Sequence, residues 1–151
     1  MSVEIDIHTF VPNDFSKFVP QKMQEKEYKL FIDKGFELLE YIEEENNTVT
    51  VELNGEVIAV FGTVPLPDKG CNGWLFFSKN VGPTGMIVSV RVFKSMFAAL
   101  EDMGYEWMQT CVRMDFPEGE RLVEMLGFTA TEVIDDPLGD GTQYKYWMKV
   151  F

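Results

Sequence analysis

The dipeptide Asn54-Gly55 constrains the fold of this chain more than any other part of the sequence. Hydrophobic residues alternate with polar ones from Val49 to Leu53 before it, and an apolar run from Val57 to Phe61 follows it. Asn and Gly both tolerate a positive φ angle, which the two central residues of a tight hairpin turn adopt. We therefore predict that the two runs form an antiparallel hairpin.

The composition is that of one folded domain. With 151 residues, 46% of them hydrophobic, the chain can bury enough apolar surface to offset the entropy lost on folding. No apolar run approaches the ~20 residues that cross a bilayer. The segment Met1 to Phe10 lacks the basic and apolar regions of a secretory signal. We expect a single domain over 1–151, located in the cytoplasm and without a membrane partner.

Charge and residue counts exclude several kinds of site. The formal net charge is −12 at pH 7 and the Lys and Arg residues form no cluster, so we expect no nucleic-acid partner. The acidity permits a cationic substrate or a basic protein partner, although it more often serves solubility. His8 is the sole histidine, and Cys71 and Cys111 have no CxxC spacing. We therefore expect no metal site, no Cys–His catalytic pair, and two core thiols.

Further periodicities predict the order of the remaining elements. The early elements are a strand from Val3 to Ile7, a short helix near Phe15 to Met23 and a longer helix from Leu30 to Glu45. A central strand from Gly73 to Phe77 follows, then a helix from Met86 to Leu100 that packs Val90, Phe93, Phe97 and Leu100 against the sheet, and a strand from Trp107 to Val112. A short helix through Leu122 to Leu126, strands from Phe128 to Ile134 and from Tyr144 to Val150, and a loop at Pro137, Gly139 and Gly141 complete the order.

Two glycines and an acidic pair mark helix ends. Gly104 and Gly127 are expected to end the two later helices in a left-handed conformation. Asp115 and Glu118 are expected to cap the start of the second. The whole order predicts an α/β fold of the α+β type, a mixed sheet with helices on its faces.

The order of elements resembles the GNAT N-acetyltransferase family over essentially the whole chain, most sharply from Trp74 to Phe128. The matching pieces are the strand Trp74 to Phe77, the loop to Gly85, the helix from Met86, the strand at Trp107 and the run Leu126-Gly127-Phe128. In that family a central strand leads through a glycine-bearing loop into a long helix, whose first amides hold the pyrophosphate of acetyl-CoA. The resemblance implies a GNAT-like fold with a mostly antiparallel central sheet, and acetyl-CoA as cofactor.

The resemblance also implies which residues contact the cofactor. They are Phe77, Ser78, Val81, Gly82, Thr84, Gly85 and Met86. A helix N-terminus offers unpaired amides and a positive dipole end, and Gly82 and Gly85 would let the backbone approach a phosphate without a Cβ in the way. The same segment can instead be a plain strand-to-helix turn. Its glycine spacing departs from the family pattern, and Pro83 removes one amide.

The catalytic residues depart further from the family. Its members often carry a tyrosine, the general acid, four residues before the glycine of the Gly-Phe pair, and Val123 stands at that place here. Ser78 and Asp115 are the candidate catalytic residues, although Asp115 can instead be a helix cap. Glu52 or Glu56 could act as general base, directly or through water.

A narrower resemblance is to small internal virion proteins of short-tailed bacteriophages, which look like acetyltransferases with a degraded cofactor loop. It rests on Trp74-Leu75-Phe76 with Ser78, the helix through Arg91, Phe93 and Lys94, Tyr105-Glu106-Trp107, and Arg121 ahead of Leu126-Gly127. Two functions follow. The favoured one is acetyl transfer from acetyl-CoA to a primary amine of a small molecule or protein. The other is a non-catalytic role through protein–protein contacts, inside a phage particle or with a host protein.

Overall fold

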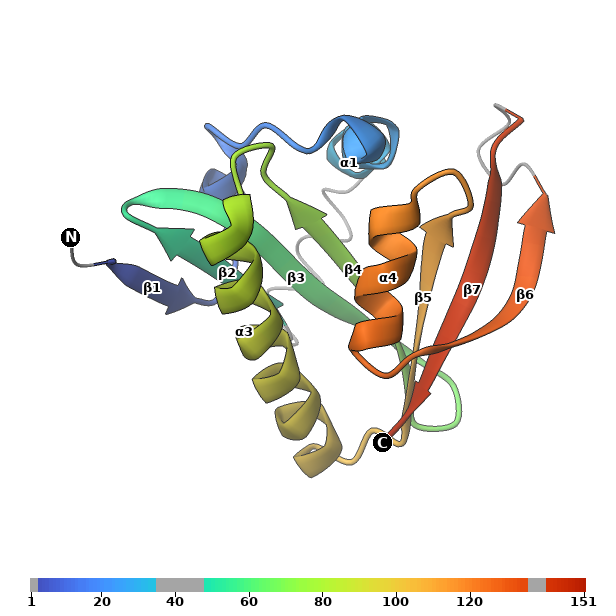
Figure 1. Ribbon diagram of the computed structural model, residues 1–151. Coiled ribbons are helices and arrows are strands. Elements are labelled where there is room, and N and C mark those ends of the chain that lie inside the picture. Colours follow the sequence, from blue (N-terminus) through green and yellow to red (C-terminus); the bar gives the residue numbers. More distant parts are fainter. Residues whose placement is uncertain (1–2, 35–47, 136–140) are drawn as a thin grey trace. The chain divides into compact units, whose positions relative to one another are not determined.

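A computed structural model of the protein describes residues 3–34, 48–135 and 141–151 (Figure 1). Two compact units share the chain, one made of Met1–Val64 and Leu75–Phe93 and the other of Pro65–Trp74 and Lys94–Phe151. The single domain over 1–151 stays a prediction. Among the described helices, none has the length and hydrophobicity needed to cross a membrane.

The elements follow the predicted order. The first unit holds β1 (Ile5–His8), the 3-10 turns η1 (Pro12–Phe15) and η2 (Lys22–Gln24), α1 (Glu25–Lys34), β2 (Thr48–Leu53), most of β3 (Glu56–Leu66), the end of β4 (Gly70–Phe77) and the first half of α3 (Gly82–Asp102). The second unit holds the rest of β3, β4 and α3, then β5 (Trp107–Arg113), α4 (Pro117–Met125), β6 (Thr129–Asp135) and β7 (Gln143–Val150). The described strands form one sheet in the order β1-β2-β3-β4-β5-β7-β6. It is mixed, because β4 and β5 pair in parallel and pairs such as β2–β3 and β5–β7 are antiparallel.

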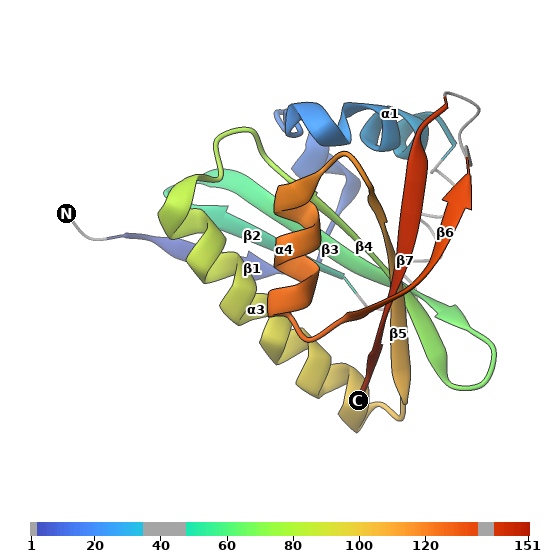
Figure 2. The same ribbon diagram turned by 45° about the vertical axis from the view of Figure 1, so that its right-hand side comes forward.

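The hairpin predicted at Asn54-Gly55 is confirmed. The two residues have φ angles of 50° and 80°, and Leu53 lies opposite Glu56 across the turn. β1 pairs antiparallel with β2, so it lies beside the hairpin in the first unit (Figure 2). The same sheet contains β4, as predicted.

β4 is buried on both faces within the first unit. The ring of Phe76 lies 5.4 Å from that of Tyr28 and 5.5 Å from that of Phe31, both on α1. The ring of Phe77 lies 6.0 Å from that of Phe93 on α3. Because successive side chains of a strand point to opposite faces, α1 and the first half of α3 cover opposite faces of β4.

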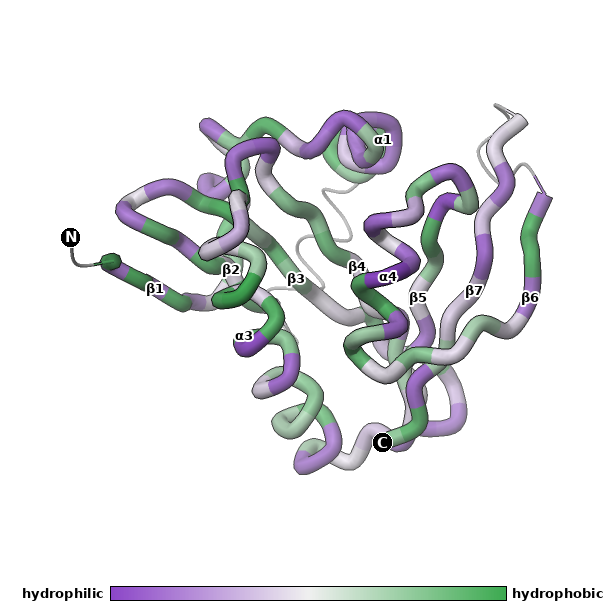
Figure 3. Tube along the Cα trace, in the orientation of Figure 1, coloured by the Kyte–Doolittle hydropathy of each residue, from purple (hydrophilic) through white to green (hydrophobic). Residues whose placement is uncertain are grey.

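The apolar stripe of α3 is confirmed in its main positions. Phe93, Phe97 and Leu100 are 1%, 6% and 1% exposed, whereas Val90 is half-buried. Hydrophobic and hydrophilic residues alternate along this helix (Figure 3). The positive φ angles of Gly104 (100°) and Gly127 (92°) confirm that these glycines end α3 and α4.

The second unit has its own aromatic core. Phe97, from the second half of α3, lies 5.9 Å from Phe128 and 6.3 Å from Phe151, measured between ring centroids. Trp147 of β7 is 3% exposed and Met108 of β5 is 1% exposed. The parallel register of β4 and β5 runs from Gly70 opposite Trp107 to Asn72 opposite Gln109.

Some local predictions were wrong. Instead of a helix over Phe15 to Met23 there are the two turns η1 and η2 with an extended segment between them, in which Pro20 pairs with Ser78. α1 begins at Glu25, earlier than predicted, and the rest of the helix predicted to Glu45 lies outside the described residues, as do Pro137 and Gly139.

The predicted acidic cap of α4 was also wrong. The N-cap residue is Phe116, and no side chain caps the helix. The carboxylate of Asp115 instead accepts hydrogen bonds from the guanidinium of Arg113 at 2.9 and 2.8 Å. The charge-assisted pair competes with the helix amides for the same oxygens.

We expect Phe97→Ala to lower the free energy of unfolding by about 3–5 kcal/mol, because it opens a cavity beside Phe128 and Phe151. Urea denaturation measures the change. Ile87→Ala, on the same helix but 57% exposed, should change it by less than about 0.5 kcal/mol. An unchanged midpoint for Phe97→Ala would contradict the observed burial.

Candidate functional site

The turn that joins β4 to α3 contains the segment predicted to bind the cofactor. The backbone N–H of Ser78 donates to the carbonyl of Ile58 at 2.8 Å, and that of Lys79 donates to the carbonyl of Val19 at 2.9 Å. The N–H of Gln21 donates to the carbonyl of Phe77 at 3.0 Å. The end of β4 is therefore held between β3 and the segment that precedes η2.

Gln24 adds a side-chain brace to the same strand end. Its amide nitrogen donates to the carbonyl of Leu75 at 2.8 Å, and its amide oxygen accepts from the N–H of Phe77 at 2.9 Å. The side chain thus copies the donor and acceptor of a neighbouring strand. The position at which β4 ends is fixed by this brace together with the burial of Phe77.

Ser78 is buried and its polar groups close the turn. It is 3% exposed, its hydroxyl accepts from the N–H of Asn80 at 3.1 Å, and its carbonyl accepts from the N–H of Val81 at 3.1 Å. The backbone amides from Phe77 to Val81 all donate within the protein, so none of them is available to a phosphate. Within the described residues this geometry gives the Ser78 hydroxyl a structural role.

The first turn of α3 is different, because its amides have no preceding helical turn to donate to. Gly82, Pro83 and Thr84 are exposed, and Gly82 has a φ angle of 61° with no atom within 4 Å of the place a Cβ would take. Pro83 has no N–H, and the N–H of Gly85 is the first that a helical carbonyl can accept, which leaves the amides of Gly82 and Thr84. Together with the helix dipole they favour an anion.

Gly85 is packed closely against its neighbours. A Cβ on this residue would lie 3.0 Å from Cδ1 of Ile58 and 3.2 Å from Cγ2 of Val81, so its missing side chain lets α3 lie close to the sheet. Of the two glycines, Gly82 is the one with open space beside its backbone, and the contact of either with a phosphate stays a prediction. Met86 is half-buried.

The charges beside the helix start are mixed. Lys79 and Asn80 are exposed, and the amide nitrogen of Asn80 donates to a carboxylate oxygen of Glu56 at 2.9 Å. Glu56 is one of the two candidate general bases and is thus tied to the candidate site. Its negative charge opposes a bound phosphate, whereas Lys79 favours one.

The other candidate catalytic groups lie elsewhere. Val123, at the place of the tyrosine in the family pattern, is 8% exposed and has no proton to donate. Burial raises the pKa of Cys71 to about 11, so its thiol is inert at neutral pH. Cys111, on β5, is exposed. The expectation of two core thiols was therefore wrong for this residue.

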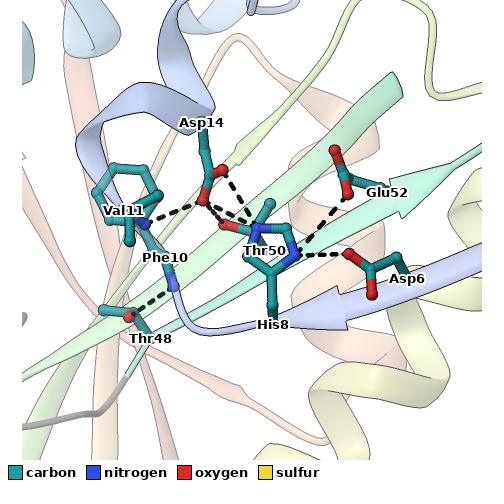
Figure 4. A network of polar contacts seen from close by, with 8 residues as sticks. All are labelled: Asp6, His8, Phe10, Val11, Asp14, Thr48, Thr50 and Glu52. Atoms are coloured by element: carbon teal, nitrogen blue, oxygen red, sulfur yellow. Dashed lines mark hydrogen bonds and ion pairs between the residues drawn. The ribbon is translucent and has the colours of Figure 1, made fainter. Parts of the chain in front are cut away.

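The other candidate base, Glu52, belongs to a polar cluster with Asp6 and His8 (Figure 4). The hydrogen bond with Asp6 raises the pKa of Glu52, and hydrogen bonds to His8 and Glu52 lower that of Asp6. Burial lowers the pKa of His8, but its hydrogen bonds to Asp14 and Asp6 outweigh this and raise it. Sequence reasoning missed the cluster, although the alternation in β1 places Asp6 and His8 on one face.

No protein-family model matches the sequence, and a search of curated proteins found no match. Solved structures do match. A ribosomal-protein-alanine N-acetyltransferase from Brucella melitensis is 10% identical with a TM-score of 0.72, over 96% of this chain and 99% of that one. An acetyltransferase of the GNAT family from Streptococcus pneumoniae is 12% identical with a TM-score of 0.70, over 98% of this chain and 99% of that one.

A third structure was solved with a ligand. It is a protein from Salmonella typhimurium described as a proposed acetyltransferase, with its cofactor acetyl-CoA, and it is 12% identical with a TM-score of 0.71, over 97% of this chain and 93% of that one. At such identities the likeness shows the fold alone. The chain therefore has the GNAT acyl-CoA N-acyltransferase fold that its sequence predicted.

Proposed function

We propose that this chain binds acetyl-CoA at the start of α3 and transfers the acetyl group to a primary amine. The observation that carries the proposal is Gly82, which begins a 21-residue helix with open space where a Cβ would lie. Proteins that share the fold are named as N-acetyltransferases, and one was solved with acetyl-CoA.

The residues present fit the pyrophosphate of the cofactor, over a shorter segment than the sequence suggested. The amides of Gly82 and Thr84 would donate to its oxygens, and Thr84 and Lys79 are exposed there. Three of the predicted contact residues are buried and would support the turn from inside the protein: Phe77, Ser78 and Val81. Bound acetyl-CoA supplies a thioester carbonyl for attack by the amine.

Proton transfers would rely on water and carboxylates. Without a tyrosine at Val123, the leaving thiolate would take its proton from solvent, which a thiol with a pKa of about 8.5 permits near neutral pH. Glu56, which accepts a hydrogen bond from Asn80 beside the helix start, would act as the general base. The net charge of −12 favours a cationic amine as acceptor, whether a small molecule or a protein.

A second function is a non-catalytic role through protein–protein contacts on the same fold. Two observations favour it: Val123 replaces the proton donor, and the amides from Phe77 to Val81 are already hydrogen-bonded. The resemblance to internal virion proteins of phages belongs to this alternative. It stays a prediction, as does a location in the cytoplasm or in a phage particle.

We expect Gly82→Asp to weaken acetyl-CoA binding by at least about tenfold, or ~1.4 kcal/mol, because it places a carboxylate among the phosphate-binding amides. Aspartate tolerates a positive φ angle, so the fold should persist. Calorimetry measures the affinity, and the melting temperature should rise with cofactor in the parent protein. Gly85→Glu is unsuitable as a test, since its side chain would strike Ile58.

Two matched variants separate charge from backbone strain. Gly82→Asn carries the same strain without the charge and should keep most of the affinity. Gly141→Asp adds the charge at another open, positive-φ glycine, in the other unit, and should leave binding unchanged. Release of free thiol with a panel of amines then tests turnover. Binding of acetyl-CoA without turnover would favour the interaction role. If calorimetry shows no binding heat and the melting temperature does not change at millimolar acetyl-CoA, both the proposed binding and the proposed enzyme activity are refuted.

A further inference from the structure

The polar cluster on β1 and β2 has the geometry of a metal site. The antiparallel register places Asp6 directly opposite Glu52 and His8 directly opposite Thr50. Because side chains alternate between the faces of a strand, all of them project from the same face of the pair. One oxygen or nitrogen atom from each of Asp6, His8 and Glu52 lies within 4.8 Å of the other two.

A third carboxylate, that of Asp14, orients the imidazole through its other ring nitrogen. Nε2 of His8 lies 3.2 Å from both carboxylate oxygens of Asp14, a side chain that is only 11% exposed (Figure 4). Asp14 is itself held by the N–H of Val11 at 2.9 Å and by the hydroxyl of Thr50 at 2.7 Å. With a metal ion bound, Asp14 would hold the ring proton on Nε2 and leave the lone pair of Nδ1 to face Asp6 and Glu52. Metal-binding histidines are typically oriented by a carboxylate in this way.

The spacing of the facing atoms suits a small divalent ion. Nδ1 of His8 lies 2.9 Å from the nearest oxygen of Asp6 and 3.8 Å from that of Glu52. Metal–ligand bonds of about 2.0–2.2 Å at tetrahedral or octahedral angles separate two ligand atoms by roughly 2.9–3.5 Å. Glu52 would have to move closer to the other two ligand atoms, and its partly exposed side chain can do so by rotation.

We propose that Asp6, His8 and Glu52 bind one divalent transition-metal ion, with Zn²⁺ as its best representative. Carboxylate oxygens alone would suit Ca²⁺ or Mg²⁺ equally, but the imidazole nitrogen selects a transition metal. The carboxylates of Asp6 and Glu52 and the lone pair of Nδ1 repel one another unless a positive charge lies between them. A proton on Nδ1 supplies it in the metal-free chain, and the metal ion would displace that proton.

The test uses the full chain without a histidine tag, freed of metal by a chelator. Titration with Zn²⁺ should show one ion per chain, and Ca²⁺ or Mg²⁺ should not compete. Since His8 is the sole histidine, its ring nitrogens can be assigned without ambiguity by NMR. We expect the Nδ1 resonance to move on binding while Nε2 keeps its proton. Coordination through Nε2, or no change at either nitrogen, would overturn the proposal.

Variants separate the ligands from the positioning residue. His8→Gln and Asp6→Asn should each weaken Zn²⁺ binding by about 100-fold or more, and Asp14→Asn by roughly 10–100-fold, since it acts through the imidazole. Circular dichroism checks that each variant folds, and Asp6, which is 62% exposed, is the one least able to disturb the fold. Cys111→Ser is the control for an exposed thiol and should bind as the parent does. Binding that survives His8→Gln, or that is lost only in Cys111→Ser, would place the ion elsewhere and refute the site.

Discussion

The candidate cofactor site depends on two successive phenylalanines of β4 that point to opposite faces of the sheet. Phe76 packs on α1 and Phe77 packs on α3, so the strand cannot shift or rotate without exposing one of the rings. Gln24 and the carbonyls of Ile58 and Val19 then hold the residues at its end. The first turn of α3 starts from a fixed point for this reason. A helix terminus is useful to a ligand only when its position is determined in this way.

The sequence predicted best those features that a local backbone conformation determines. Asn54-Gly55, Gly104 and Gly127 each require a positive φ angle, which few residues tolerate, and each lies where the pattern placed it. The segment from Phe15 to Met23 was predicted wrongly because its conformation depends on distant partners. Its extended part pairs with Ser78, more than fifty residues away, and no local pattern signals that contact.

The same distinction divides the predictions about the site. The sequence indicated that glycines precede the long helix, but only the neighbours of each glycine separate their roles. Gly82 opens onto free space, whereas Gly85 lies against Ile58. Asp115 was expected to cap a helix, and Arg113 two residues earlier binds it instead. The register of β1 and β2, which brings Asp6 opposite Glu52, is a tertiary property that alternation alone cannot supply.

The first unit thus contains two polar features that favour charges of opposite sign. The start of α3 attracts negative charge, whereas the Asp6–Glu52 pair must attract positive charge, because like charges directly opposite on neighbouring strands destabilise their pairing. Both features adjoin the β2–β3 hairpin, through Glu52 on one strand and Glu56 on the other. β1 is paired with β2 across that repulsion, and a proton on His8 would offset it. We therefore expect the pairing of this strand to depend on whether a proton or a metal ion lies beside Nδ1 of His8.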